Sequence, residues 1–442
     1  MVPSISKLEE TILSRLNMAE MGMRGALRMS QTLLKVYPHA LRWGLSRRKP
    51  SPAELRAMFE SLGATYIKFG QLVASSPSIF PKEYVDEFQL LLDQTPTIPF
   101  AKIRQIIEGD LGRPLEEVYS FVDSTPLASA SIAQVHVATL LSGEDVVVKV
   151  QKPGVRAIIN VDMNTAYVCA RITEMMMPNI GKDAIAGMIA ELYQAMIDEC
   201  DFRKEAQHLE EFRSYLKSTA NAQVLAPKPY PLASGEQVLT MERFYGKPLT
   251  DLEQIKTVVK DPATTLMAAM NTWFASLTQC ESFHADLHNG NMMVLDDGRV
   301  AFIDFGMVGR IQPEAWQAVF NLMGGLSEQN YRLVAESMLA VGVTKEDIKV
   351  DELCADIEQL FESVYDIAPE SVLDSPAGIS GIDEAMTNLG EVSKKYGIRF
   401  PRAFTLLLKQ FLYFDRYIEI LAPGLDMFAE AQMEALERGP LH

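Results

Sequence analysis

Short runs of β-branched and other apolar residues mark the strands of this chain. Met292–Leu295 and Val300–Ile303 are two such runs, and Asp296-Asp297-Gly298 between them has the composition of a tight hairpin turn. Val146–Val150 is a third run, and Ile132–Ala138 upstream of it predicts a neighbouring strand. The pattern therefore predicts two groups of short strands, separated by about 140 residues of sequence.

Longer segments with helical character surround these strands. The longest runs from about Ala184 to Leu216, and others lie within 53–120, 313–324 and 331–339. The sequence Lys49-Pro-Ser-Pro52 ends the first helical segment, because proline cannot continue a helix. On this basis the chain divides into a basic helical arm (1–49), a helical extension (50–120), a small mixed lobe (121–246) and a helical large lobe (247–442).

The strongest chemical signal flanks the predicted hairpin. Before it the chain reads His284-Ala-Asp286-Leu-His-Asn-Gly-Asn291, and after it Asp304-Phe-Gly. Phosphoryl transfer needs this spacing, with Asp286 orienting or deprotonating an attacking hydroxyl while Asn291 and Asp304 hold Mg²⁺ against nucleotide phosphates. The hairpin returns the chain so that Asp304 lies near Asn291. We therefore predict a site for ATP and Mg²⁺.

A different metal is an alternative for the same loop. His284, His288 and Asp286 could together chelate zinc. Zinc would explain neither Asn291 nor the aspartate at the strand end. The orienting histidine of kinase catalytic loops is the better interpretation of His284.

Two further parts of a nucleotide site lie upstream. Lys149 lies within the apolar run Val146–Val150, like the kinase strand lysine that holds the α- and β-phosphates. Burying an unpaired ammonium group is prohibitively costly, so Lys149 requires an anionic partner, for which Glu205 is the candidate. The segment Met241–Gly246, which includes Glu242, occupies the hinge position where backbone groups meet adenine.

The phosphate-covering loop differs from that of ordinary protein kinases. In its place the chain reads Leu127-Ala-Ser-Ala-Ser131, without glycine. Alanine does not readily adopt the positive φ angles with which glycine wraps phosphates, so this loop should be stiffer and more restrictive. The residues expected to line the phosphates are Ala128, Ala130 and Ser131.

This departure identifies a family. The chain resembles the UbiB/AarF family of atypical protein-kinase-like proteins, whose members carry an alanine-rich loop. Lys68-Phe-Gly70-Gln71 matches the Lys-x-Gly-Gln motif of that family, and Glu199-Cys-Asp201 matches its Glu-x-Asp motif. Pro153-Gly-Val and the loop from Phe283 to Asn291 are also typical. The resemblance spans about residues 50 to 330.

The resemblance implies an α+β, protein-kinase-like bilobal fold with a helical extension that folds over the active site. That extension occupies the space where a protein kinase receives a peptide, and its Lys68 contacts Glu199 or Asp201. Members resemble ATPases or small-molecule kinases of isoprenoid lipid metabolism, often supporting ubiquinone biosynthesis, so an isoprenoid lipid or quinone precursor is the expected partner. The implied catalytic set is Asp286, Lys149, Glu205, Lys68, Glu199 and Asp201.

Two other functions remain open. A small-molecule phosphotransferase of the aminoglycoside or choline kinase type would also use Asp286, Asn291 and a later aspartate, but it would not explain Lys68 or the Glu-x-Asp motif. A pseudoenzyme that uses bound nucleotide as a conformational signal is the second alternative. No motif decides whether the acceptor is a lipid, a protein or water.

The net charge and the cysteine content limit which partners and which cellular compartment we expect for this protein. The net charge of −17 over 442 residues argues against nucleic acid, which requires a basic footprint. The four cysteines lack paired spacing and therefore indicate reduced thiols of an intracellular protein. We expect a cytosolic protein, or one that faces the cytosol.

The first 49 residues differ in charge from the rest of the chain. They contain nine lysine and arginine residues against three glutamates. A basic helical arm of this kind either lies on an anionic bilayer as a peripheral membrane contact or packs on the core with a solvated basic face. No run reaches the ~18 uninterrupted apolar residues of a transmembrane helix, and the best late segment, Ala403–Asp415, is broken by Lys409.

Overall fold

The computed structural model describes most of the chain, in two compact units. The first unit takes the described residues up to Lys204 together with Tyr230–Met241, and the second takes Glu205–Pro229 and the described residues from Glu242 onward. The four-part division stays a prediction. The two units are divided differently, because residues 205–229 of the predicted small lobe belong to the second unit. The described residues are 23–46, 50–74, 82–88, 90–91, 96–176, 184–288, 290–311, 313–344, 348–367, 392–393, 395–398 and 400–425.

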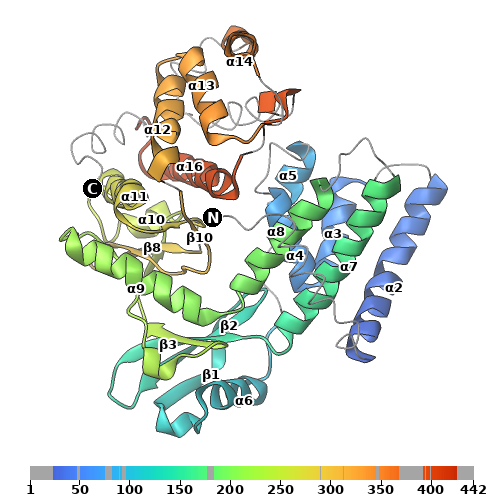
Figure 1. Cartoon of the computed structure of the whole chain (residues 1–442). Helices are drawn as coiled ribbons and strands as arrows, with labels where there is room; N and C mark the ends of the chain where they lie inside the picture. Colours follow the sequence, from blue (N-terminus) through green and yellow to red (C-terminus); the bar gives the residue numbers. More distant parts are fainter. Residues whose placement is uncertain are drawn as a thin grey trace. The chain divides into compact units, whose positions relative to one another are not determined.

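The first unit contains a four-stranded sheet. Its order is β1-β2-β3-β5, and the strands are β1 (Tyr119–Ser129), β2 (Ala133–Leu140), β3 (Asp145–Gln151) and β5 (Val238–Glu242). β2 pairs antiparallel with both β1 and β3. Helix α6 (Phe100–Leu111) lies against this sheet (Figure 1), and its Ile103 and Ile107 join one buried cluster with Val146, Val148 and Val150 of β3.

Helices make up the rest of the first unit. They are α2 (Met23–Ser46), α3 (Pro52–Leu62), α4 (Ala64–Ala74), α5 (Lys82–Phe88), α7 (Val155–Met176) and α8 (Ala184–Asp198). Ser51 and Glu54 form a reciprocal capping box that starts α3. Gly63, with φ of +97°, ends α3 and turns the chain directly into α4, which a residue with a side chain would resist. The extension predicted to be helical is therefore helical over these stretches.

The prediction of one continuous helix from about Ala184 to Leu216 is wrong. The structure has α8 and then α9 (Phe202–Ser218), and the break falls on the Glu-x-Asp motif. Gln151 Nε2 donates to the Cys200 carbonyl at 3.0 Å, and the amide of Phe202 donates to the Glu236 carbonyl at 3.0 Å. The Cys200 carbonyl and the Phe202 amide therefore form hydrogen bonds with segments that are distant in the sequence, and not with residues of a continuing helix.

The basic arm is described from Met23 to Ser46, and residues 1–22 and 47–49 lie outside the described part of the chain. Two of its described cations contact other helices of the first unit. Arg28 forms a two-nitrogen contact with Asp162 of α7 at 3.0 and 2.7 Å, and Lys35 donates to the Ser61 carbonyl. Helix α2 thus packs on the rest of the first unit, and contact of the arm with a membrane stays a prediction. Among the described helices, none is long and apolar enough to cross a membrane.

The second unit is built around two small sheets. One has the order β4-β9-β8-β6, from β4 (Val224–Leu225), β9 (Val300–Phe302), β8 (Met292–Leu295) and β6 (Gly246–Pro248). The other pairs β10 (Val308–Gly309) with β7 (Phe283–His284). The predicted hairpin is present as β8 and β9, with Gly298 at φ +86° in the turn between them.

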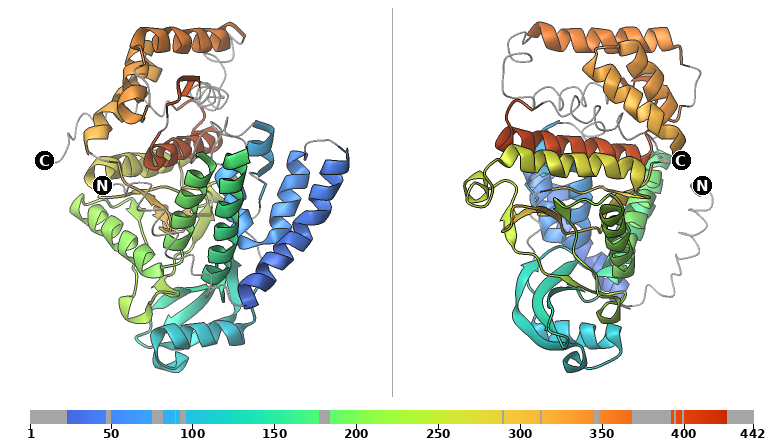
Figure 2. Two further views of the ribbon diagram at one scale, coloured as in Figure 1. Left: turned by 45° about the vertical axis from the view of Figure 1, so that its right-hand side comes forward. Right: turned by 90° about the vertical axis from the view of Figure 1, so that its left-hand side faces the viewer.

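Helices flank these sheets. They are α10 (Leu252–Ile255), α11 (Pro262–Gln279), α12 (Pro313–Ser327), α13 (Tyr331–Val341), α14 (Val350–Ile367) and α16 (Arg402–Leu421). Helices α11 and α16 run side by side (Figure 2), and the buried Trp273 of α11 contacts Phe411 and Phe414 of α16 at ring distances of 6.0 and 5.1 Å. This aromatic contact anchors α16, which lies near the end of the chain, in the core of the second unit.

Candidate active site

The catalytic-loop motif and the Asp-Phe-Gly motif meet in the second unit. β7 ends at His284 and pairs with β10, which begins just after Gly306, so that His284 lies opposite Val308. The amide of Ala285 donates to the carbonyl of Met307 at 3.1 Å. The short β7–β10 ladder therefore brings Asp286 beside the segment that contains Asp304.

Asn291 and Asp304 lie at the same end of the β8–β9 hairpin. Asn291 immediately precedes β8, and its carbonyl accepts a hydrogen bond from the Ile303 amide at 3.0 Å, one residue before Asp304. Asn291 Nδ2 donates to the Asp286 carbonyl at 2.8 Å, which assigns Oδ1 as the atom that can bind a cation. Asp304 Oδ1 accepts from the Gly306 amide at 2.9 Å. An amide oxygen and a carboxylate at one hairpin end fit Mg²⁺, which prefers oxygen ligands.

His284 orients the loop from within the core. It is fully buried, and its Nδ1 accepts a hydrogen bond from the Asp286 amide at 3.1 Å. Burial lowers the pKa of His284 to about 4, so the imidazole is neutral at neutral pH. Its ring lies edge-on to Phe305 at 4.7 Å. His284 therefore connects the loop that holds Asp286 with the Asp-Phe-Gly segment, which is the orienting role expected from the sequence.

The zinc alternative finds no support in the geometry. Within the described parts of the chain, no group of three or more His, Cys, Asp or Glu side chains could hold a metal ion. The Nδ1 atom of His284 already accepts from a backbone amide, and that of His288 accepts from the Gly290 amide at 2.9 Å.

The carboxylate of Asp286 has a partner that sequence reasoning missed. Lys409 of α16 places its Nζ 2.8 Å from Asp286 Oδ1, and His288 Nε2 lies 3.6 Å from Oδ2. Burial lowers the pKa of Lys409, but the charge of Asp286, together with hydrogen bonds to Asp286 and Tyr413, outweighs it and raises the pKa overall. Lys409 is therefore cationic. The rule applied to Lys149, that a lysine inside an apolar run needs an anionic partner, would have found it.

Glu205 belongs to the second unit and lies near the Asp-Phe-Gly segment. It is buried, and a Cβ built on Gly306 would lie 3.8 Å from its Oε2 and 3.1 Å from Asp304 Oδ1. Lys149 belongs to the first unit, where it is buried in β3 opposite Val135 with its ammonium group 5.4 Å from the centre of the Phe202 ring. The pairing of Lys149 with Glu205 stays a prediction.

The first unit brings the Lys-x-Gly-Gln and Glu-x-Asp motifs together. Lys68 Nζ of α4 lies 2.8 Å from Glu199 Oε2, and both side chains are largely buried. The resemblance implied a contact with Glu199 or Asp201, and the ion pair with Glu199 is present. Gly70 lies where α4 approaches the segment after α5, because a Cβ built on it would lie 2.1 Å from Leu91 Cδ1. The side chain of Gln71 lies outside the described part of the structure.

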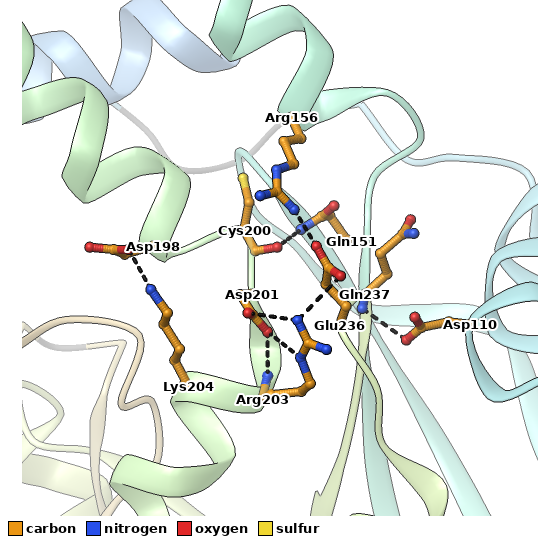
Figure 3. A network of polar contacts seen from close by, with 10 residues as sticks. All are labelled: Asp110, Gln151, Arg156, Asp198, Cys200, Asp201, Arg203, Lys204, Glu236 and Gln237. Carbon is orange, nitrogen blue, oxygen red and sulfur yellow. Dashed lines mark hydrogen bonds and ion pairs between the residues drawn. The ribbon is translucent and has the colours of Figure 1, made fainter. Parts of the chain in front are cut away.

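Asp201 takes part in a separate network (Figure 3). Arg203 donates from Nε and Nη2 to its two carboxylate oxygens, both at 2.9 Å, and Arg203 Nη2 also lies 3.3 Å from Glu236. The hydrogen bonds from Arg203 lower the pKa of Asp201. Nearby, Lys204 pairs with Asp198 at 2.5 Å. The Glu-x-Asp segment is therefore held by ion pairs on both sides of the helix break.

The alanine-rich segment is mostly strand instead of loop. β1 continues to Ser129, and Ala128 lies opposite Val135 in the sheet. The turn is limited to the residues that follow, where the Ala130 amide donates to the Ala133 carbonyl at 2.9 Å. Ser131 in this turn is buried. The predicted loop was too long because cross-strand hydrogen bonds, which the sequence does not reveal, extend β1.

The remaining nucleotide residue, Glu242, lies at the end of β5. Its amide donates to the Lys228 carbonyl at 2.9 Å, and its Oε2 accepts from the Lys228 amide at 3.2 Å. Both the backbone and the side chain of Glu242 are thus tied to the preceding segment of the second unit. The contact of this hinge with adenine stays a prediction.

Comparison with known proteins identifies the family. Residues 90–338, more than half of the chain, match the model of the ABC1 atypical kinase-like domain. The chain belongs to this family. An aarF domain-containing protein kinase of Arabidopsis thaliana, named as uncharacterised and chloroplastic, is 44% identical over 400 residues, covering 87% of this chain and 74% of the relative. A probable protein kinase UbiB of Tolumonas auensis is 29% identical over 407 residues, covering 90% of this chain and 73% of the relative.

A solved structure supports the fold. The complex of Rv3197 with erythromycin from Mycobacterium tuberculosis matches with a TM-score of 0.50 at 24% identity, covering 80% of this chain and 91% of that chain. The kinase-like α+β fold and the resemblance to UbiB/AarF proteins are therefore confirmed. The roles of the individual site residues stay predictions.

Proposed function

We propose that this ABC1 chain binds ATP with Mg²⁺ and transfers the terminal phosphoryl group to a small hydroxylated acceptor or to water. The observation that supports it best is the meeting of Asp286, Asn291 and Asp304 at one end of the β8–β9 hairpin in the second unit. Phosphoryl transfer requires one carboxylate toward the acceptor and an amide and a carboxylate toward the metal.

Each residue has a role in this proposal. Asn291 Oδ1 and the Asp304 carboxylate would hold Mg²⁺, which would neutralise charge on the phosphates. Asp286 orients the acceptor hydroxyl. Orientation is the main requirement, because phosphoryl transfer proceeds through a loose transition state that depends mainly on positioning.

We propose an isoprenoid lipid or quinone precursor as the acceptor class, in support of isoprenoid-quinone metabolism. The ion pair of Lys68 with Glu199 is the contact that the resemblance to UbiB proteins implies. The resemblance to UbiB proteins supports the lipid class. Ubiquinone content in cells that lack this chain, restored by the parent sequence and not by Asp286→Asn, would be the corresponding cellular result.

The direct test is Asp304→Asn, matched with Asp297→Asn. Asp297 lies in the turn of the same hairpin, is half-exposed and pairs with Arg299. We expect Asp304→Asn to abolish the magnesium-dependent thermal shift with ATP and the release of phosphate, and Asp297→Asn to retain both. An unchanged magnesium-dependent shift in Asp304→Asn would contradict the metal assignment.

Phosphate release and transfer of label from γ-labelled ATP together separate the alternatives. A nucleotide-switched pseudoenzyme binds Mg²⁺ and ATP without releasing or transferring phosphate. A phosphotransferase of the aminoglycoside or choline kinase type labels a soluble amine-containing acceptor from γ-labelled ATP, whereas the proposed function predicts label in a lipid extract or as free phosphate.

A further inference from the structure

Helix α16 binds the catalytic loop around Asp286, although Lys409 of α16 lies 123 residues away from Asp286 in the sequence. Gln410 is fully buried, and both atoms of its amide bind the loop: Oε1 accepts from the Leu287 amide at 2.7 Å, and Nε2 donates to the Ala285 carbonyl at 2.8 Å. Ala285 and Leu287 are the residues on either side of Asp286. One side chain of α16 therefore fixes the backbone around the proposed catalytic aspartate.

The neighbouring residue on α16 fixes the side chain of that aspartate. Lys409 Nζ lies 2.8 Å from Asp286 Oδ1, and its side chain is 13% exposed. With Oδ1 bound to Lys409, the rotation of the carboxylate about its Cβ–Cγ bond is restrained. The second oxygen, Oδ2, lies 3.6 Å from His288 Nε2 of the same loop.

The helix is itself rigidly placed in the second unit. Tyr417 is buried, and its hydroxyl donates to the Leu287 carbonyl at 2.8 Å. Phe411 and Phe414, buried next to Trp273, hold the same helix against α11 (Figure 2). The contacts of α16 with the loop are thus made from a fixed support, which is what precise positioning of a reacting group requires.

A lysine at this position is unfavourable for stability alone. The free energy lost when two charges of an ion pair are removed from water is about as large as the free energy gained from their attraction. An apolar residue of similar volume usually stabilises a core at least as well. Apart from Gln410, the buried residues of α16 are apolar or aromatic. A charge kept against Asp286 at such a site therefore indicates a role in placing that carboxylate.

We propose that Lys409 and Gln410 are positioning residues for phosphoryl transfer: Gln410 sets the backbone of the catalytic loop, and Lys409 sets the orientation of the Asp286 carboxylate. This inference rests on the proposed function, in which Asp286 orients the acceptor. Displacement of a reacting group by about 1 Å can lower the rate of an enzyme on the order of 100-fold. The loss of either residue should therefore affect turnover much more than nucleotide binding.

The test compares Lys409→Met, Lys409→Arg and Gln410→Leu with Arg416→Met. Arg416 is an exposed cation seven residues further along α16, so its replacement removes the same charge from the same helix. We expect Lys409→Met and Gln410→Leu to lower kcat for phosphate release at least tenfold, with the Kd for ATP and Mg²⁺ changed less than twofold. Lys409→Arg should recover part of the loss, and Arg416→Met should match the parent.

Hydrogen exchange at the Leu287 amide provides a readout without turnover. We expect faster exchange in Gln410→Leu and Lys409→Met than in the parent, and parental exchange in Arg416→Met. A parental kcat in Lys409→Met, or equal losses of kcat and of nucleotide affinity with no recovery in Lys409→Arg, would overturn the inference. If the parent protein neither released nor transferred phosphate, the proposed function would be wrong. The positioning role would be wrong independently of that result if the Leu287 amide exchanged at the parental rate in both Gln410→Leu and Lys409→Met.

Discussion

Replacement of Gly70 by alanine tests whether the glycine of the Lys-x-Gly-Gln motif is required for packing. In the structure α4 passes so close to its neighbours that a Cβ on Gly70 would lie 2.1 Å from Leu91 Cδ1 and 2.7 Å from Phe88 Cδ1. Both neighbours are buried, at 7% and 1% exposed, so neither can move aside into solvent. The added methyl group must therefore displace core side chains.

The magnitude follows from two opposing effects. Overpacking of a buried site costs about 1–3 kcal/mol, and the contact distances place Gly70 in the upper half of that range. Alanine is favoured over glycine within a helix by about 1 kcal/mol. The net loss in the free energy of unfolding is about 1–2 kcal/mol, which lowers Tm by roughly 2–8 °C for a unit of this size.

Thermal unfolding of Gly70→Ala and Gly109→Ala is the measurement. Gly109 lies in α6, where no atom of the described residues is within 4 Å of a built Cβ, so its replacement should raise stability by up to about 1 kcal/mol. Adding Leu91→Ala to Gly70→Ala should restore space and cost less than the sum of the two single changes. The packing argument would be refuted if Gly70→Ala unfolded at the same temperature as Gly109→Ala.

Two further predictions concern the Lys68 ion pair and the basic arm. Lys68→Ala should clearly change ATP hydrolysis or autophosphorylation, and it should also lower Tm, because it leaves the largely buried Glu199 carboxylate without its ion pair. Lys204→Ala, which removes the exposed pair with Asp198, should leave turnover unaltered. Parental turnover in Lys68→Ala would contradict a role of the Lys-x-Gly-Gln motif in the nucleotide chemistry. On α2 the apolar side chains of Leu34, Tyr37 and Leu41 are 73%, 65% and 47% exposed, so replacing all three by serine should reduce co-sedimentation with anionic vesicles. Equal sedimentation of variant and parent would count against membrane contact through this face.

Local features of the structure followed directly from the sequence. The hairpin strand Met292–Leu295 has the predicted bounds, because a short apolar run and an Asp-Gly turn are determined by neighbouring residues. β3 (Asp145–Gln151) likewise contains the predicted run around Lys149, because a strand buried along its length is visible in the sequence as a continuous β-branched run. The motif spacing around Asp286, Asn291 and Asp304 likewise sufficed to predict that they meet, since only one hairpin separates the last two.

Contacts between distant segments were decided by the tertiary structure. The long helix is broken at Cys200 because Gln151 and Glu236 supply hydrogen bonds that a helix would otherwise make internally. The alanine-rich segment is strand because β2 pairs with it.

The contacts of α16 with the catalytic loop show most clearly what the sequence alone does not predict. By itself, the sequence determined which residue types bear the phosphotransfer chemistry, because that chemistry requires particular groups at short spacings. Only the tertiary structure decided that Lys409 and Gln410 hold Asp286, because no local pattern records a contact across 123 residues. A lysine in an apolar run indicates that a carboxylate must be near, and the packing of α16 on α11 determines which carboxylate it is.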